Sequence, residues 1–421
     1  MTETSLTQRQ PSVWWGAMII CGTVVGAGMF TLPVVMAGAW FGWSLLILLV
    51  SWGCMLLSGL LFQQASRYFP LGAGYDTLTR SLLGRRWAAL NGLSILFVLG
   101  ILTYAYISAS GPVYQHSLNS AGLPVSTAGA KAILTLCVAI VVWLGTKGVS
   151  RIMTFCVLAK LLLLVTVFGG LLTQVDLLTL ADADADADAG NGEGGYWSYA
   201  FGVLPFCLAS FGYHGNITGL ISYYGGEQKQ VRRALVFGTL MSLIIYLFWI
   251  TGTMGNLPRA AFPAVVAAGG DIAALLAALR DRLHVGALSF MMTLFSHFAV
   301  IASFLGVTAG LFDFIADRLK LGDTPLARFK VALLTFAPAL SASLWFPDGF
   351  LAAIGFAGLF ATLWAVIVPA LLYIKARRRF AKQERAGALS NLAPAIVIAF
   401  GVLNILAWTL SWLGMLPVFS G

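Results

Sequence analysis

The stretch Gly22-Thr23-Val24-Val25-Gly26-Ala27-Gly28 decides the expected fold, because it places three glycines inside a long apolar run. Each glycine in a helix interior costs roughly 1 kcal/mol relative to alanine, so a cluster of three weakens the helix locally. A second interruption, Ser210-Phe211-Gly212-Tyr213-His214-Gly215-Asn216, follows Pro205 in a later apolar run. We therefore expect two helices that are each broken near the middle.

The composition of the chain identifies the solvent in which these helices lie. Of the 421 residues, 59% are hydrophobic and only 10% are charged, whereas soluble domains carry roughly 25% charged residues. So few charges cannot cover a soluble protein of this size, and the chain needs lipid around it. Soluble enzymes, nucleic-acid-binding proteins and secreted disulfide scaffolds are excluded.

The apolar runs predict the number of membrane spans. A spanning helix needs about 20 mostly apolar residues. Eleven runs qualify, so we expect an all-α polytopic membrane protein. The expected spans are 13–38, 42–66, 88–115, 127–146, 151–174, 197–223, 232–256, 286–312, 328–346, 349–373 and 392–415.

The basic residues predict the orientation of the chain. If the N-terminus is cytoplasmic, 20 of the 25 Lys and Arg residues fall in cytoplasmic segments, as the positive-inside rule requires. With eleven spans, the C-terminus then lies outside. Most of the net charge of +9 is thereby explained by topology, and a nucleic-acid partner is not needed.

An acidic repeat precedes the sixth apolar run on the outer side. Asp182, Asp184, Asp186 and Asp188 alternate with Ala and lead into a Gly-rich segment that ends at Gly195. Like charges without partners are typical of a solvated, low-complexity linker. A mouth that attracts cations is the alternative interpretation.

The two interruptions open successive blocks of five runs, which predicts a transporter with an inverted repeat and broken helices at the membrane midplane. A broken helix frees N–H and C=O groups that lipid cannot satisfy, so they must face protein or a watery cavity. Freed N–H groups attract a carboxylate and freed carbonyls attract an ammonium, so an amino acid suits two adjacent breaks. The competing interpretation is close helix packing, because Gly22 and Gly26 have the small-xxx-small spacing.

Five stretches of the sequence are distinctive. They are GTVVGAGMFTLPVVMAGAW (22–40), LTYAYISASG (102–111), LPFCLASFGYHGN (204–216), MGNLPR (254–259) and SFLGVTAGLFDFIAD (303–317). These stretches resemble the hydroxy and aromatic amino acid permeases of the amino acid–polyamine–organocation superfamily. Within that family, the first two stretches and the segment SFGYHGN are most similar to the bacterial tryptophan-permease branch.

This resemblance implies a bundle of leucine-transporter type in the bacterial inner membrane, with uptake of an amino acid driven by protons. It places the N-terminus in the cytoplasm and the C-terminus in the periplasm. The segments are a tail (1–12), the first five-helix repeat (13–174), an outer loop (175–196), the second repeat (197–373), a basic cytoplasmic loop (374–391), the last span (392–415) and an outer tail (416–421).

The candidate substrate site comes from the two breaks and from nearby aromatic and polar side chains. An indole needs flat apolar walls and one hydrogen-bond acceptor for its N–H. Most aromatic residues of such a chain nevertheless pack in the core or face lipid. The candidates are Thr23, Gly26, Ala27, Gly28, Tyr104, Tyr106, Ser108, Phe206, Phe211, Gly212, Tyr213, His214 and Asn216, with a contribution from Ser303.

Lys160 is the candidate for proton coupling. It lies in the middle of the fifth span, where an ionised amine is costly and usually marks a functional site, and burial makes loss of its proton easier. In proton-coupled relatives within the superfamily, a lysine of span five stands where sodium-coupled relatives hold sodium, so the resemblance assigns that role to Lys160. The alternative is a lysine that extends to the inner interface beside Arg151.

No motif points to an enzyme, a cofactor or a metal. The four histidines have no metal-ligand spacing, and the chain has no phosphate loop and no dinucleotide fingerprint. The expected partners are the amino acid substrate, protons and the lipid bilayer. We expect symport of L-tryptophan. The alternatives are a permease for tyrosine, serine or threonine, sodium coupling, or an amino acid receptor that does not transport.

Overall fold

The computed structural model describes residues 12–26, 28–183, 195–282, 286–320, 324–380 and 388–419, and the regular structure within these ranges is all helical. Nine helices in the described part are long and apolar enough to cross a membrane. They are α3 (Trp40–Ser66), α5 (Arg85–Ser120), α6 (Thr127–Leu144), α7 (Thr146–Leu172), α11 (Gln228–Met254), α14 (Gly286–Leu319), α15 (Pro325–Trp345), the continuous unit α16 (Phe350–Ala361), η4 (Thr362–Ile367) and α17 (Val368–Phe380), and α18 (Ala388–Trp412).

The first expected break is present as a bent pair of helices. α1 (Val13–Val24) and α2 (Gly28–Met36) meet at 54° and make a tenth span if the pair is counted as one. The second expected break lies between α9 (Ala200–Ser210) and α10 (Ile217–Tyr223), with the short turn η2 (His214–Asn216) between them. These halves are too short to qualify as spans by length.

The helices extend past the apolar runs, and the connections contain short helices. The third span was expected at 88–115, but α5 adds polar turns at both ends; likewise α14 continues to Leu319. The connections between the expected spans hold α4 (Tyr75–Leu83), α8 (Leu177–Leu180), η3 (Arg259–Ala261), α12 (Phe262–Ala267) and α13 (Ile272–Arg282). The short turn η1 (Tyr196–Tyr199) occupies the start of the expected sixth span. Counting apolar residues finds only the part of a helix that needs lipid, so it misses these turns.

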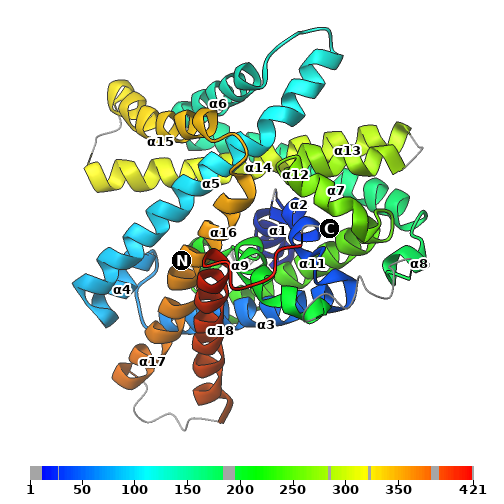
Figure 1. The fold of residues 1–421 in the computed structure, drawn as a ribbon. Helices are drawn as coiled ribbons and strands as arrows, with labels where there is room; N and C mark the ends of the chain where they lie inside the picture. Colours follow the sequence, from blue (N-terminus) through cyan, green and yellow to red (C-terminus); the bar gives the residue numbers. More distant parts are fainter. Residues whose placement is uncertain are drawn as a thin grey trace, which may run out of the picture.

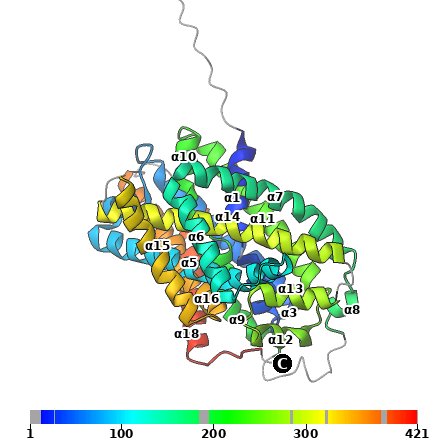
Figure 2. The same cartoon turned by 90° about the horizontal axis from the view of Figure 1, so that it is seen from above.

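The broken segments lie at the centre of the bundle. In Figure 1, α1 and α2 occupy the middle of the view beside α9. α1 packs against α11, α2 against α9, α7 against α14, and α16 against both α5 and α9. Figure 2 shows the start of α1 and the C-terminal end at opposite ends of the bundle. Residues 1–11, including most of the expected tail 1–12, lie outside the described residues.

One acidic residue of the Asp-Ala repeat does not behave as a solvated linker residue. The Asp182 carboxylate lies 3.6 Å from the Arg259 guanidinium, and both side chains are largely buried. Its Oδ2 also accepts a hydrogen bond from the Tyr196 hydroxyl at 2.8 Å. The expectation of an unpartnered charge is therefore wrong for Asp182, because the fold brings a basic residue from a distant segment to it. Asp184, Asp186 and Asp188 lie outside the described residues.

Candidate functional site

The first break leaves two carbonyl groups that a lysine satisfies. Lys160, on α7, is fully buried. Its Nζ donates to the Gly22 carbonyl at 2.7 Å and also to the Val25 carbonyl. A cation bound to carbonyl oxygens at a helix C-terminus is the arrangement that the helix dipole favours. The amine is therefore held inside the bundle, which differs from the alternative of a lysine that extends to the interface.

The second break is closed by the backbone in a tight turn. α9 ends at Ser210, and the Gly212 N–H then donates to the Ala209 carbonyl, three residues earlier, at 3.2 Å instead of continuing the α-helical pattern. The chain then makes the single turn η2 before α10 begins. Gly212 and Gly215 are exposed, so this segment presents bare backbone rather than side chains.

Three polar side chains join the two breaks. The Asn216 amide donates to the Thr23 hydroxyl at 2.7 Å, and the Ser210 hydroxyl donates to the Gly28 carbonyl at 3.3 Å. The Tyr246 hydroxyl, from α11, lies 2.7 Å from the Val24 carbonyl and 2.8 Å from the Ser210 carbonyl.

These contacts bring the two interruptions side by side, as the sequence predicts. Ala27, at the apex of the first break, lies outside the described residues.

Ser303, on α14, packs directly against Gly26 of the first break. A Cβ built at the buried Gly26 would overlap the Ser303 hydroxyl and lie 3.2 Å from the Ser303 Cβ. Glycine at this position therefore allows α14 to approach the break. Tyr106, on α5, is also buried, with its ring 6.2 Å from the ring of Phe304.

The aromatic residues of the second break are buried among other helices. The Phe211 ring lies 5.2 Å from the Tyr246 ring. The Tyr213 hydroxyl donates to the Met55 carbonyl of α3 at 2.9 Å, and its ring stacks on His214 at 4.6 Å. Both His214 ring nitrogens are buried without a hydrogen-bond partner in the described part of the chain, which leaves polar capacity beside the second break.

Three candidates have their printed contacts elsewhere. The Tyr104 hydroxyl donates to the Phe346 carbonyl at 2.7 Å, at the connection between α15 and α16. Phe206 packs under α16, where a Cβ at Gly355 would lie 3.2 Å from its ring. Ser108 is buried, and its hydroxyl has no partner among the described residues. The structure does not show these three side chains joined to the two breaks by hydrogen bonds.

Two further features have no signal in the glycine pattern. Tyr246 is one tyrosine in an apolar run, so nothing in the sequence distinguishes it. The π-helical turn η4 could have been predicted from Pro369 instead. Proline has no N–H to donate to the carbonyl four residues earlier, here that of Ala365, so the regular α-helical pattern is interrupted. Ser58 donates to that carbonyl at 2.5 Å.

The turn η4 also carries a tryptophan beside the second break. Trp364 lies edge-on to His214, with ring centroids 6.2 Å apart, and its buried indole N–H has no partner among the described residues. Its carbonyl accepts from the Tyr75 hydroxyl at 2.8 Å. No group of three or more His, Cys, Asp or Glu side chains that could hold a metal occurs in the described ranges.

Known proteins match the whole length of the chain. The sequence matches the tryptophan/tyrosine permease family over residues 9–408. A tryptophan-specific transport protein of Shigella flexneri is 46% identical over 420 residues, which cover all of both chains. A low affinity tryptophan permease of Escherichia coli is 43% identical over 421 residues, with 99% of this chain and 100% of the relative covered.

A solved structure shares the fold. The outward-open, substrate-bound form of a Na⁺-coupled sialic acid symporter superposes with a TM-score of 0.59 at 16% identity, covering 95% of this chain and 89% of that chain. At this identity the likeness shows the fold alone. The chain is a multi-pass membrane protein, and it belongs to the tryptophan/tyrosine permease family, a family of transporters and not of enzymes.

Proposed function

We propose that this chain is a proton-coupled symporter that imports L-tryptophan across the bacterial inner membrane by alternating access. The substrate follows from the family and from two relatives whose names specify tryptophan. The observation that carries the coupling is the Lys160 amine, which is buried and donates to two carbonyls of the first break. A proton on this amine alters the contact between α7 and α1, and thus the position of the broken helix.

Gain and loss of one proton have different effects on this contact. A protonated amine makes charge-assisted hydrogen bonds, which are roughly twice as strong as neutral ones. Loss of the proton weakens the bonds to Gly22 and Val25 and leaves their carbonyls poorly satisfied. The inner half of the broken helix, α1, is then free to move away from α7. Proton release toward the cytoplasm is in this way linked to opening of the inner side.

The substrate site lies between the two breaks. The first turn of α2 has N–H groups without helical partners, so it suits the substrate carboxylate. Carbonyls of Phe211–Tyr213 suit the ammonium. The proposed substrate contacts are Thr23, Gly26, Ala27, Gly28, Tyr104, Ser108, Phe206, Phe211, Gly212, Tyr213, His214 and Asn216, with Ser303 beside Gly26.

The proposed topology has eleven spans and a 5+5 inverted repeat. The first repeat comprises α1–α2, α3, α5, α6 and α7. The second comprises α9–α10, α11, α14, α15 and α16–α17, and α18 is the last span. The segments keep the boundaries expected from the sequence, with the N-terminus cytoplasmic and the C-terminus periplasmic. The excess of basic residues on one side supports this orientation.

Uptake into proteoliposomes tests the function. We expect an inward proton gradient to drive accumulation of radiolabelled L-tryptophan, and an inward sodium gradient at equal pH to have no effect. Unlabelled tryptophan should compete better than tyrosine, phenylalanine, serine or indole. Sodium-driven uptake without a pH response would contradict the proton assignment. Tight tryptophan binding without uptake would indicate a receptor, and preferential competition by tyrosine or serine would change the substrate.

A further inference from the structure

A cavity of about 630 Å³ lies between the C-terminal end of α5, the helix α13 and the N-terminal end of α14. Its lining contains no residue of either break, so it is separate from the proposed transport site. Its volume is within the range of sites for small molecules, roughly 300–1,000 Å³. Because α13 belongs to a connection on the outer side of the proposed topology, the cavity lies at the periplasmic end of the bundle.

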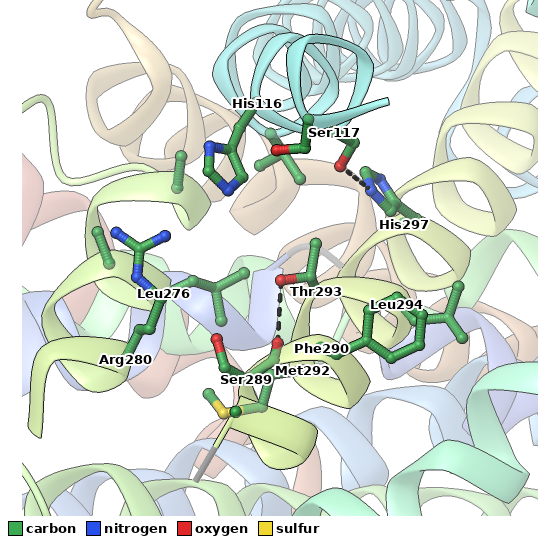
Figure 3. A pocket seen from close by; sticks show the side chains of 15 residues that line it. His116, Ser117, Leu276, Arg280, Ser289, Phe290, Met292, Thr293, Leu294 and His297 are labelled. Carbon is green, nitrogen blue, oxygen red and sulfur yellow. Dashed lines mark hydrogen bonds between the residues drawn. The ribbon is translucent and has the colours of Figure 1, made fainter. Parts of the chain in front are cut away.

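One wall of the cavity is polar. Figure 3 shows the His116 ring and the Arg280 guanidinium directed toward the same space from α5 and α13. Next to His116 on α5, the Ser117 hydroxyl lies 2.8 Å from the His297 Nε2 of α14. The other ring nitrogen of His297 is buried and has no hydrogen-bond partner in the described part of the chain. The groups on this wall that can form hydrogen bonds with a ligand are therefore the His116 ring and the Arg280 guanidinium.

Arg280 supplies positive charge that protein contacts neutralise only weakly. Its one ion pair in the described ranges is with its neighbour Asp281, at 3.7 Å through Nε, and both side chains are about half exposed or more. Such exposed ion pairs contribute little to the stability of a protein. No Asp or Glu is present among the described residues that line the cavity. A planar guanidinium suits carboxylates and phosphates, which it can bind with two hydrogen bonds.

Apolar side chains also line the cavity. They include Leu276, on the same helix as Arg280, and Phe290 and Leu294 of α14, and the Phe290 side chain is 63% exposed on the surface of the bundle. In a membrane-spanning bundle, such an exposed aromatic ring contacts lipid. The cavity thus combines a cationic polar end with an apolar side that continues to the membrane.

We propose that this cavity binds an anionic amphiphile. The carboxylate or phosphate head group is held between Arg280 and His116, and the apolar body lies along Leu276 and Phe290. Two sources share this chemistry, a phospholipid of the surrounding leaflet and a free fatty acid. The exposed position of Phe290 gives both of them access from the membrane.

Binding to the purified full-length protein tests the proposal. The probes are dioleoyl phosphatidylglycerol, with phosphatidylcholine as the neutral-head-group comparison, measured by native mass spectrometry, and laurate, measured by calorimetry. Arg280→Gln removes the charge, and Thr293→Trp fills the cavity. Arg282→Gln is the matched control, because Arg282 is an exposed arginine on the same helix that does not line the cavity.

We expect the wild type and Arg282→Gln to bind at least one anionic probe, and Arg280→Gln and Thr293→Trp to bind it at least fivefold more weakly. Loss of phosphatidylglycerol identifies the lipid as the source, and loss of laurate identifies the free acid. Thermal unfolding and tryptophan uptake should match the wild type in all variants, which separates a lost site from misfolding. Equal binding of both probes by all four proteins, or no binding to the wild type, would overturn the proposal.

Discussion

The two broken helices differ in the groups that satisfy the backbone carbonyls left without helical partners. At the first break, freed carbonyls are bound by the ammonium group of Lys160 from α7. At the second, the Ser210 carbonyl is met by the neutral Tyr246 hydroxyl, and the chain turns tightly through η2. Among the described residues, the first break is therefore contacted by a basic amine, whereas the ionisable side chain of the second break, His214, has no hydrogen-bond partner. We therefore expect protons to act at the first break, and the tight turn of the second break to keep its geometry.

The two breaks also differ in how tightly other helices enclose them. Gly26 faces Ser303 so closely that α14 leaves no room for a Cβ, whereas Gly212 and Gly215 are exposed. Interiors that are this closely packed switch between discrete arrangements instead of deforming gradually. We infer that a change at Lys160 moves the first break relative to both α7 and α14.

Replacement of Lys160 tests the difference between the breaks most strongly. A hydrogen bond to a charged group contributes about 1.5–3 kcal/mol, so Lys160→Gln should reduce proton-driven accumulation at least tenfold. It should also abolish the dependence of uptake on external pH, because glutamine does not titrate. The measurement is uptake of labelled tryptophan into proteoliposomes at several external pH values.

Lys131→Gln is the matched control for this variant. Lys131 is equally buried, at 2% exposure, but its amine donates to the Ser343 carbonyl, away from both breaks. We expect it to lose stability while keeping the pH response. A Lys160→Gln protein that still accumulates tryptophan in response to the proton gradient would remove the charge-based distinction between the two breaks.

A methyl group at Gly26 should be the next most damaging change. Overpacking of this kind costs about 1–3 kcal/mol, because the new Cβ overlaps the Ser303 hydroxyl. Gly26→Ala should lower the uptake rate about tenfold, and Ser303→Gly in the same protein should restore part of it. Gly215→Ala, at the exposed second break, is the comparison and should cost less. Equal effects of the two alanine substitutions would show that enclosure by α14 is unimportant.

Removal of the Tyr246 hydroxyl should have an intermediate effect. Tyr246→Phe leaves the buried carbonyls of Val24 and Ser210 without this donor, which costs about 1–3 kcal/mol. Thermal unfolding should shift downward and the uptake rate should fall severalfold. Tyr75→Phe removes a comparable hydroxyl from the Trp364 carbonyl and should affect stability more than transport. If Tyr75→Phe reduces transport as much as Tyr246→Phe, the link between the breaks has no special role.

The contact between Asn216 and Thr23 should give the smallest effect. This hydrogen bond of 2.7 Å is exposed, so water can replace either partner. We expect Thr23→Val and Asn216→Ala each to raise the KM for tryptophan about two- to fivefold. In a double-mutant cycle the pair should show a coupling of about 0.5–1.5 kcal/mol. Additive effects would mean that the two breaks do not communicate through this pair.

The sequence predicts the position of both breaks because their cause is local. Glycine weakens a helix wherever it occurs, so Gly22–Gly28 and Ser210–Asn216 could be found without neighbours. The position of Lys160 inside an apolar run was equally visible. By contrast, the partners of Tyr104 and Tyr213 could not be predicted, because an aromatic residue in an apolar run carries no information about which helix it faces.

The sequence by itself determined that lipid surrounds this chain, that its structure is helical, that two helices are interrupted, and that one lysine lies among apolar residues. These properties follow from composition and from local preferences along the chain. Only the tertiary structure decided that Lys160 reaches Gly22, 138 positions away, that Tyr246 joins the two breaks, and that Asp182 pairs with Arg259. Such contacts depend on how the helices pack. Packing brings together residues that are far apart in the chain, and local sequence preferences do not indicate which residues those are.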